Sequence, residues 1–389
     1  METEKLYYAD PFLTDFTATV LDCQPGKNGY LVTLDRTAFY PEGGGQPADH
    51  GVLDGAVVTD VHEKNSVILH NVDRAVEIGK TVTGTIDWGR RFDHMQQHSG
   101  EHICSGLICE RFHCDNVGFH MGADIVTIDF NADISWEELL EIEAKANQYL
   151  YENHPIDIQF HRGAELEAID YRSKKALEGD VRIVAFPGAD CCACCGTHVL
   201  RSGQVGLVKF LSVQKFREGV RIELLCGKRA LEYLSKTWEQ AKAIGQRLSV
   251  KPVDSEAAVE RLEGELTSLK LRCTQLEESV FESIAKELAG KGDVMLFQPS
   301  MRPDSVRRLM DAVSKTCSGL AAVFSGEEGH YAYALGRADG QDISPLVKAM
   351  NTALHGRGGG RNGFAQGSVE TERSAIESFF KENGYGICD

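Results

Sequence analysis

The residues of this sequence best suited to chemistry are the thiols and imidazoles that gather between Asp190 and His198. This stretch, DCCACCGTH, holds four cysteines and one histidine within nine residues. Far upstream, His94 and His98 have the spacing that puts two side chains on one face of a helix, about 5–6 Å apart. Nitrogen and thiolate ligands suit zinc. We therefore predict a Zn²⁺ site formed by His94, His98, Cys194 and His198.

Two other readings use the same residues differently. The segment from His98 to His102 fits the H-x-x-E-H pattern of a class of zinc metallopeptidases, with Glu101 as general base. That assignment leaves His94 and the cysteine stretch without a role, and Gly100 weakens the helix that it needs. A C-x-x-C within the cysteine stretch also leaves a pure thiol site open.

The number of ligands bears on the role of the metal. Four protein ligands would close a tetrahedral site, whereas catalysis normally keeps one position open for water or substrate. The spacing leaves open whether all four predicted ligands bind at once. The other thiols of the stretch, Cys191, Cys192 and Cys195, are expected to have supporting roles.

Composition sets the broad class of the protein. The chain has 389 residues, 42% of them hydrophobic, and a formal net charge of −17. This charge argues against a protein that coats nucleic acid by bulk electrostatics, but it allows a local basic patch. No window resembles a membrane span or a signal peptide, and the 12 cysteines are too sparse for a disulfide scaffold. We therefore expect a cytoplasmic protein without membrane contact.

Periodicity indicates an α+β fold in four parts. Residues 1–90 alternate short β-rich runs with turns and predict a small barrel-like subdomain. Residues 91–227 mix helices with antiparallel strands and would form the zinc-binding domain. Within them, Ser135 with Glu138 three residues on predicts a capping box at the start of a helix. Residues 228–290 have apolar positions at steps of three and four, which predicts a coiled-coil hairpin or a dimer seam. Residues 291–389 predict a compact α/β module.

Two glycine-rich motifs have the composition of binding surfaces. Gly43, Gly44 and Gly45, followed by Gln46, predict either a plain turn or a wall that another molecule approaches closely. Between residues 355 and 368, further glycines accompany arginines, a combination suited to phosphate.

Several motifs together resemble a known family. Tyr40–Gln46, His94-x3-His98 and the Cys194–His198 stretch resemble the editing domain of alanyl-tRNA synthetase and its free-standing relatives, the AlaX proteins. Gly358–Arg361 resembles the DHH-associated domain that ends those synthetases. We expect no aminoacylation domain before residue 1, so the resemblance is to the long free-standing form. Cys195 departs from the glycine that the synthetases more often have there, which affects loop geometry more than chemistry.

The resemblance implies hydrolysis of the ester that links serine, or glycine, to alanine tRNA, with a zinc-associated water as the proposed attacking group. Accepting the seryl ester while rejecting alanyl-tRNA calls for polar groups, and the candidates are the Gly43–Gln46 wall and the threonines Thr33 and Thr37. The partner is mischarged alanine tRNA, and a homodimer through the coiled coil or the C-terminal module is a further expectation. The alternative is a non-catalytic tRNA- or RNA-binding protein with a structural zinc. Candidate tRNA-binding residues are Lys209, Lys215, Arg217, Arg221, Lys228, Arg229, Gly359, Gly360 and Arg361.

Overall fold

A computed structural model describes residues 2–173, 179–327 and 329–386 of the chain. The chain divides into two compact units, Met1–Ala243 and Ile244–Asp389, and each is described by itself. The fold is mixed α+β, as predicted, and the metal-ligand candidates all lie in the first unit.

The first unit begins with a barrel whose strands bury alternate side chains. In Thr81–Ile86, for example, Val82 and Ile86 point into the core while the threonines face outward, as the two-residue period of a strand requires. A short parallel pair, β1 (Glu4–Lys5) with β4 (Arg36–Thr37), and the helix α1 (Leu6–Ala9) accompany the barrel. The strands β2 (Asp15–Gly26), β3 (Gly29–Leu34), β5 (Gly51–Leu53), β6 (Ala56–Lys64), β7 (Val67–Val72) and β8 (Thr81–Ile86) close in the order β2-β3-β7-β6-β5-β8.

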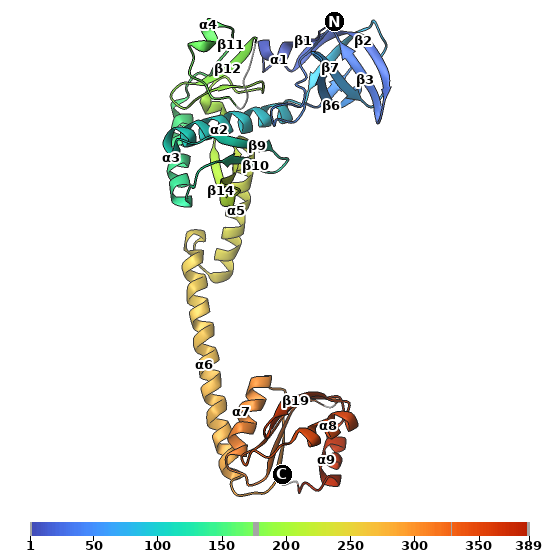
Figure 1. Ribbon diagram of the computed structural model, residues 1–389, viewed down its shortest axis with the longest axis vertical. Coiled ribbons are helices and arrows are strands. Elements are labelled where there is room, and N and C mark those ends of the chain that lie inside the picture. The colour runs from blue at the N-terminus through green and yellow to red at the C-terminus, as the bar shows by residue number, and fades with distance from the viewer. Residues whose placement is uncertain (1, 174–178, 328, 387–389) are drawn as a thin grey trace. The chain divides into compact units, whose positions relative to one another are not determined.

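The helix α2 (Trp88–Phe112) runs from the barrel through the centre of the first unit (Figure 1). Asp87 caps its first turn by accepting a hydrogen bond from the Arg90 amide at 3.1 Å. Gly100 lets the helix approach a neighbouring strand, since a Cβ there would lie 2.3 Å from Cys226 Sγ. Gly106 likewise lets the segment at Ala189 approach the helix, since a Cβ at position 106 would lie 2.1 Å from the Ala189 carbonyl oxygen. These glycines, which weaken the helix locally, are the positions where other segments pack closest to it.

Two sheets and a second long helix surround α2. One sheet has the order β14-β15-β10-β9 and the other β11-β12-β13, and all their pairings are antiparallel. Ser135 and Glu138 form the predicted capping box at the start of α3. The elements are β9 (Asn116–Met121), β10 (Val126–Phe130), α3 (Trp136–Glu152), β11 (Asp157–His161), α4 (Ala164–Glu167), β12 (Val181–Phe186), β13 (Asp190–Ala193), η1 (Ser202–Val205), β14 (Val208–Phe216) and β15 (Gly219–Cys226).

A buried ion pair joins the barrel to the start of α2. Arg91 and Asp49 are both fully buried, and the Arg91 guanidinium donates to the Asp49 carboxylate through Nε at 3.0 Å. The same guanidinium donates to the carbonyls of Ala38 at 2.6 Å and Pro11 at 2.9 Å. One cation therefore holds three segments of the N-terminal part against the helix that carries the site.

Replacing Asp49 by alanine is expected to lower the free energy of unfolding by about 3–5 kcal/mol, because it leaves the Arg91 cation buried without a counter-charge. Urea denaturation followed by circular dichroism measures this change. The control is Asp73→Ala, which removes an exposed partner of Arg74 and should cost less than about 1 kcal/mol. Equal effects of the two substitutions would contradict the proposed importance of the buried pair.

The helix α5 (Gly227–Leu248) begins in the first unit and ends in the second, and the turn η2 (Pro252–Asp254) precedes α6 (Ser255–Glu287). The last turns of α6 pack on α7 through Phe281 and Ala285, which are 5% and 4% exposed. Upstream, the residues at the predicted coiled-coil positions are 41–60% exposed. The coiled-coil seam therefore stays a prediction. These exposed residues, named the α6 stripe below, are Val259, Leu262, Leu266, Leu269, Leu276 and Val280.

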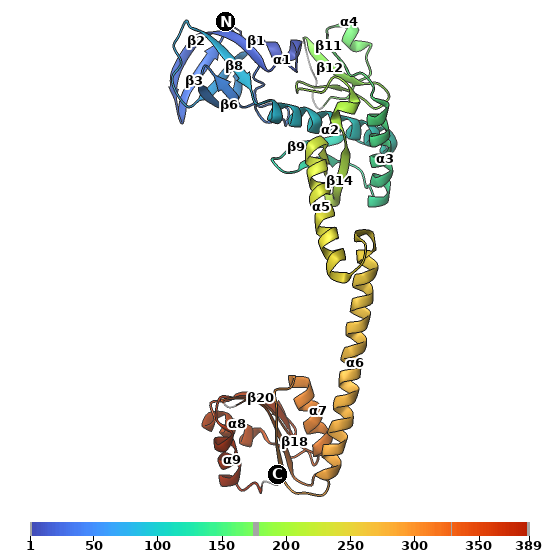
Figure 2. The ribbon, with the colours of Figure 1, turned by 180° about the vertical axis from the view of Figure 1, so that it is seen from behind.

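The second unit is built on one sheet of order β16-β17-β18-β20-β19, in which only β16 and β17 run parallel (Figure 2). Among the described residues, no helix has both the length and the apolar character needed to cross a membrane. The elements of this unit are β16 (Val294–Gln298), α7 (Pro303–Ser314), β17 (Leu320–Glu327), β18 (His330–Arg337), α8 (Ser344–Ala353), β19 (Arg357–Arg361), β20 (Phe364–Val369) and α9 (Arg373–Glu382).

Candidate metal centre

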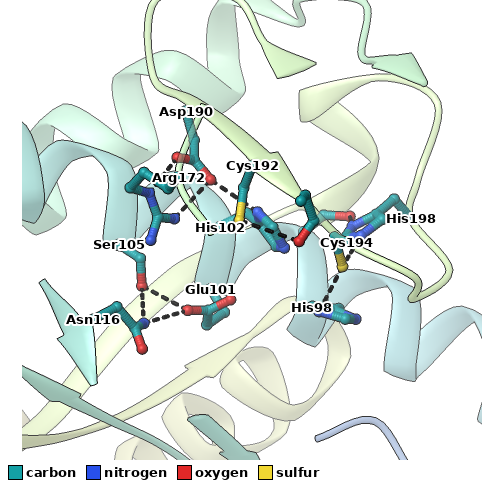
Figure 3. A network of polar contacts seen from close by, with 12 residues as sticks. His98, Glu101, His102, Ser105, Asn116, Arg172, Asp190, Cys192, Cys194 and His198 are labelled. Carbon is teal, nitrogen blue, oxygen red and sulfur yellow. Dashed lines mark hydrogen bonds and ion pairs between the residues drawn. The ribbon is translucent and has the colours of Figure 1, made fainter. Parts of the chain in front are cut away.

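Three imidazoles and one thiol meet in the first unit (Figure 3). His98 and His102 come from α2, and Cys194 and His198 come from the segment that follows β13; their donor atoms all lie within 4.8 Å of one another. Cys194 Sγ is 3.5 Å from His98 Nε2 and 3.3 Å from His198 Nε2. A tetrahedral zinc, with bonds of about 2.0 Å to nitrogen and about 2.3 Å to sulfur, separates such donors by about 3.5 Å. The donor set therefore fits zinc in both chemistry and spacing.

His94, which was predicted as a ligand, lies outside this cluster. His102 occupies the corresponding place in the cluster. His94, His98 and His102 follow one another at intervals of four along α2, so spacing alone does not tell which adjacent pair faces the cysteine segment. The choice is set by packing, because the chain at Ala189 approaches the helix at Gly106, beyond His102. This corrects the predicted ligand set at one position.

Each imidazole of the cluster has its Nδ1 hydrogen-bonded to a different side chain. A metal-bound histidine commonly has its second nitrogen held in this way, which fixes the tautomer and the orientation of the ring. The three Nδ1 contacts are His98 with Gln46 Oε1 at 2.9 Å, His102 with Asp190 Oδ2 at 2.8 Å and His198 with Ser99 Oγ at 3.2 Å. Nε2 is thereby the nitrogen left for a metal in all three rings.

The charges within the cluster also favour the binding of a cation. Burial disfavours the Cys194 thiolate, but the imidazoles of His98, His198 and His102 overcome this and hold the pKa of Cys194 well below its ordinary value. Burial would likewise lower the pKa of His102, yet the Cys194 sulfur and the Asp190 carboxylate raise it well above its ordinary value. The lowered pKa of Cys194 favours its thiolate, and the raised pKa of His102 favours a protonated ring whose proton a metal would displace.

Zinc affinity is expected to rise with pH across the neutral range. A metal competes with the proton on His102, and the raised pKa keeps that proton in place until the pH exceeds it. Affinity should rise by about tenfold per pH unit below that pKa and level off above it. Competitive titration with a chromophoric chelator between pH 6 and 8 measures the slope, and a flat profile would contradict this proton count.

Asp190, the first residue of the DCCACCGTH stretch, supports His102, a role that the sequence pattern did not indicate. Its carboxylate accepts from His102 Nδ1 and, through both oxygens, from Arg172 at 2.7 and 2.8 Å. Burial opposes ionisation, but these hydrogen bonds lower the pKa of Asp190. The ionised carboxylate can only accept, so His102 must present Nε2 to the cluster.

The substitution Asp190→Asn is expected to weaken zinc binding by about 10–100-fold while the four ligands stay in place, because His102 loses its orienting charge. Isothermal titration with zinc measures the change. Asp157→Asn, on the exposed end of β11, serves as the control. Unchanged affinity in the Asp190 variant would show that His102 needs no such orientation.

The glycine-rich turn of the N-terminal part reaches the cluster through Gln46. Gln46 Oε1 accepts from His98, and the turn itself is closed by paired backbone hydrogen bonds between Gly43 and Gln46. Gly44 and Gly45 have φ of +60° and +87°, which only glycine adopts readily. A Cβ on Gly45 would lie 2.6 Å from the ring of Phe119. This turn is therefore a close-packed wall whose glycines are partly exposed and whose Gln46 supports a ligand.

Thr37 is not brought to the cluster. Its hydroxyl lies 2.8 Å from His70 Nε2 and accepts from the Phe39 amide at 3.1 Å, and both Thr37 and His70 are fully buried in the barrel. Burial lowers the pKa of His70 to about 4, so the pair is a neutral hydrogen bond of the core. The structure gives Thr37 a packing role rather than a substrate contact.

Glu101 does not face the cluster as a general base would. Its Oε1 accepts from Ser105 Oγ at 2.6 Å and from Asn116 Nδ2 at 2.9 Å (Figure 3). The H-x-x-E-H pattern thus contains both α2 histidines of the cluster, His98 and His102. Its glutamate, Glu101, belongs to a separate buried network. The pure thiol site also finds no support, since each metal-capable group among the described residues contains at most one cysteine.

Three family profiles match the chain. The profile "tRNA synthetases class II (A)" matches residues 3–90, and "Threonyl and Alanyl tRNA synthetase second additional domain" matches residues 181–223. The DHHA1 domain profile matches residues 287–382. The second match includes both Cys194 and His198.

Relatives match over nearly the full chain. Alanyl-tRNA editing protein AlaX-L of Pyrococcus horikoshii is 30% identical over 96% of this chain and 96% of its own length. The chain belongs to the AlaX-L family. An alanine–tRNA ligase of Pyrococcus abyssi is 32% identical over 98% of this chain but only 44% of its own length, so the chain spans less than half of that ligase. The C-Ala domain of Aquifex aeolicus alanyl-tRNA synthetase covers 24% of this chain and 90% of the domain, at 18% identity and a TM-score of 0.22, a likeness too weak to carry an argument.

Two of the predicted tRNA-binding residues of this AlaX-L family member are engaged within the protein. Lys209 Nζ lies 2.8 Å from Glu143, and Arg221 makes a two-pronged ion pair with Asp129 at 2.7 and 2.8 Å. The Arg221 guanidinium also stacks on Phe216, 3.9 Å from the ring centroid. Lys209 therefore ties β14 to α3, and Arg221 joins the neighbouring strands β15 and β10.

Lys215 and Arg217 are placed differently, at the exposed tip of the hairpin between β14 and β15. Within the described part of the chain, neither has a carboxylate partner. They remain available to a phosphate backbone, and their tRNA contact stays a prediction.

Gly359, Gly360 and Arg361 form part of β19, the edge strand of the second unit, rather than the loop that their composition suggested. All three are exposed. The glycines line a cavity of about 320 Å³ together with Lys348 and Asn351 of α8. A cationic side chain beside open backbone is consistent with phosphate binding, which also stays a prediction.

Proposed function

We propose that this AlaX-L family member is a trans-editing hydrolase that removes serine, and glycine, from mischarged alanine tRNA at a zinc-containing site. The observation that carries the proposal is the cluster itself, three imidazoles with fixed Nδ1 atoms around one thiolate. The name of the Pyrococcus horikoshii relative, an alanyl-tRNA editing protein, supports the same activity.

The chemistry required is modest, because an aminoacyl ester is already activated. A zinc held by His98, His102, Cys194 and His198 would act as a Lewis acid toward the ester or toward the attacking water. The protein supplies a rigid frame, since the Arg182 guanidinium donates to the carbonyls of both Cys194 at 2.7 Å and Gly196 at 2.8 Å. We propose that the ribose hydroxyl beside the ester relays the proton to the leaving oxygen.

Selectivity must come from polar groups, because an apolar pocket cannot strongly distinguish serine from alanine by one hydroxyl. The backbone amides of Gly44 and Gly45 have no hydrogen-bond partner among the described residues. Both glycines are exposed, and the turn that contains them is tied to His98 through Gln46. We propose that these amides bond the serine hydroxyl.

A non-catalytic, zinc-bearing tRNA-binding protein is the second candidate. It is favoured by the number of donors, because four protein ligands would close a tetrahedral site. Incubation of the purified protein with seryl-, glycyl- and alanyl-tRNA separates the two. Release of serine, with alanyl-tRNA spared, supports the hydrolase. Intact seryl-tRNA at high protein concentration, together with stoichiometric zinc and measurable tRNA binding, would establish the second candidate instead.

Homodimerisation is proposed through the α6 stripe, whose apolar residues have the spacing of a coiled-coil seam. Light scattering compares the wild type with Leu266→Lys. A monomeric variant and a dimeric wild type would support the seam, whereas a monomeric wild type would exclude it.

A further inference from the structure

His94, which the metal cluster does not use, lines a cavity of about 450 Å³ in the first unit. The wall is made by the first turns of α2, through Arg90, Asp93 and His94, and by the start of α5, through Lys228 and Arg229. These segments are separated in sequence but meet through the ion pair of Arg229 with Asp93, at 2.6 Å. The cavity is therefore bounded by two segments that an ion pair holds together.

The His94 imidazole has hydrogen-bonding capacity that the protein leaves unused. The residue is 2% exposed, and its buried Nδ1 has no hydrogen-bond partner among the residues that the structure describes. Burial, together with the charges of Arg90 and Arg229, lowers the pKa of His94 to about 3, so the ring is neutral. Because Nδ1 itself is closed to solvent, the ring contributes a neutral part of the cavity wall.

Three cations and two carboxylates line the cavity, so the excess positive charge favours an anion. These residues are Arg90, Lys228, Arg229, Asp93 and Glu232. Arg229 is neutralised by Asp93, and it also donates to the Gly122 carbonyl at 2.7 Å. Arg90 donates only its Nε, to the Ala48 carbonyl at 3.0 Å, so its terminal nitrogens have no carboxylate partner within the described chain. These terminal nitrogens have the planar geometry that binds phosphate oxygens in pairs.

Lys228 adds a second mobile cation at the rim. Its side chain is 72% exposed, and its nearest carboxylate is that of Glu232, at 3.6 Å on the next turn of α5. An exposed pair of this kind is weak, so the ammonium can exchange Glu232 for a ligand anion.

The cavity adjoins the metal cluster along two paths. His94 precedes His98 by one turn of α2, about 6 Å along the helix axis. Pro47, another wall residue, directly follows Gln46, whose Oε1 accepts from His98. A ligand in the cavity therefore lies beside the cluster.

We propose that this cavity binds the 3′-terminal nucleotides of tRNA that precede the esterified adenosine. Arg90 and Lys228 contact a phosphodiester, and the neutral His94 ring is part of the wall beside the neighbouring ribose or base. The inference rests on the proposed function, since an ester held at the cluster brings these nucleotides next to it. Free inorganic phosphate shares the anionic chemistry and is distinguished by the test.

The test measures the binding of uncharged alanine tRNA, either intact or lacking its three 3′-terminal nucleotides, to the zinc-loaded full chain at several salt concentrations. The wild type is expected to bind the intact tRNA more tightly. Arg90→Gln and Lys228→Gln should each weaken binding of intact tRNA by about tenfold and leave the truncated tRNA unaffected. Each should also reduce the slope of log affinity against log salt by about 0.7.

Lys236→Gln is the matched control, because it removes one exposed cation from the same helix outside the cavity. It should keep the preference for intact tRNA. Should Arg90→Gln lower the melting temperature, Lys228→Gln, on an exposed side chain, decides the result alone.

Retention of the preference by Lys228→Gln, or an equal loss of affinity for both tRNAs, would overturn the site. Full displacement of the intact tRNA by inorganic phosphate at constant ionic strength would assign the cavity to free phosphate and overturn it as well. Because no ester is used, this outcome is independent of whether the wild type hydrolyses seryl-tRNA.

Discussion

Replacing Cys194 by alanine is expected to remove bound zinc and to lower seryl-tRNA hydrolysis by at least about a hundredfold, the upper range seen when only a supporting group of a metal site is lost. Cys194 supplies the one sulfur around which the Nε2 atoms of His98 and His198 lie, at 3.5 and 3.3 Å. Its loss leaves three imidazoles without the anion that attracts the ion. Elemental analysis of the purified variant, paired with the deacylation assay, measures both effects.

The control for this experiment is the adjacent thiol. Cys195 is exposed and belongs to no metal-capable group among the described residues, so Cys195→Ala should keep its zinc and most of its activity. Zinc retained at one equivalent by the Cys194 variant would contradict the donor set. Loss of zinc without loss of hydrolysis would support the donor set but show that the metal has no catalytic role.

Replacing His102 and His94 one at a time is expected to give opposite results. His102→Ala should lose zinc, because the ring belongs to the cluster and is oriented by Asp190. His94→Ala should keep one zinc per chain, since that ring lines a separate cavity. We expect a fall in zinc affinity of at least about a hundredfold for the first variant and of less than about threefold for the second.

Zinc titration of the two variants side by side gives the answer. Circular dichroism spectra that match the wild type exclude unfolding as the reason for a loss. If His94→Ala lost zinc and His102→Ala kept it, the ligand set expected from the sequence would stand and the packing of α2 described above would be incorrect.

The sequence was sufficient wherever local rules decide structure. Alternating valines and isoleucines marked the barrel strands from β3 to β8, and Ser135 with Glu138 marked the start of α3. The long strand β2 was missed, although Phe16, Ala18 and Val20 alternate in it, because the alternation stops after Val20 and the strand ends in proline and glycine. The glycines of β19 suggested a loop because glycine is rare in strands, yet pairing with β20 along an open edge tolerates them.

The candidate metal site depends on tertiary packing, which local sequence rules do not describe. The residue types and the Cys-x3-His spacing predicted a metal site with His98, Cys194 and His198, and these three residues share a candidate cluster in the structure. The choice of the second α2 histidine depends on the close approach of the cysteine segment at Gly106. Asp190 and Gln46 act through hydrogen bonds to these ligands across 88 and 52 residues of chain, which no periodicity encodes. The contrast between Thr37 and Gln46, one in the barrel core and one beside a ligand, likewise depends on tertiary packing.

The separation of the donors in sequence has a thermodynamic consequence. Cys194 meets His98 across 96 residues, and Gln46 adds a contact from 52 residues before His98, so the unfolded chain contains no preformed site. Free energy gained by binding an ion is then free energy of folding for the first unit. Zinc bound as proposed would therefore make the melting temperature of the first unit rise with the free zinc concentration, and a chelator would lower it.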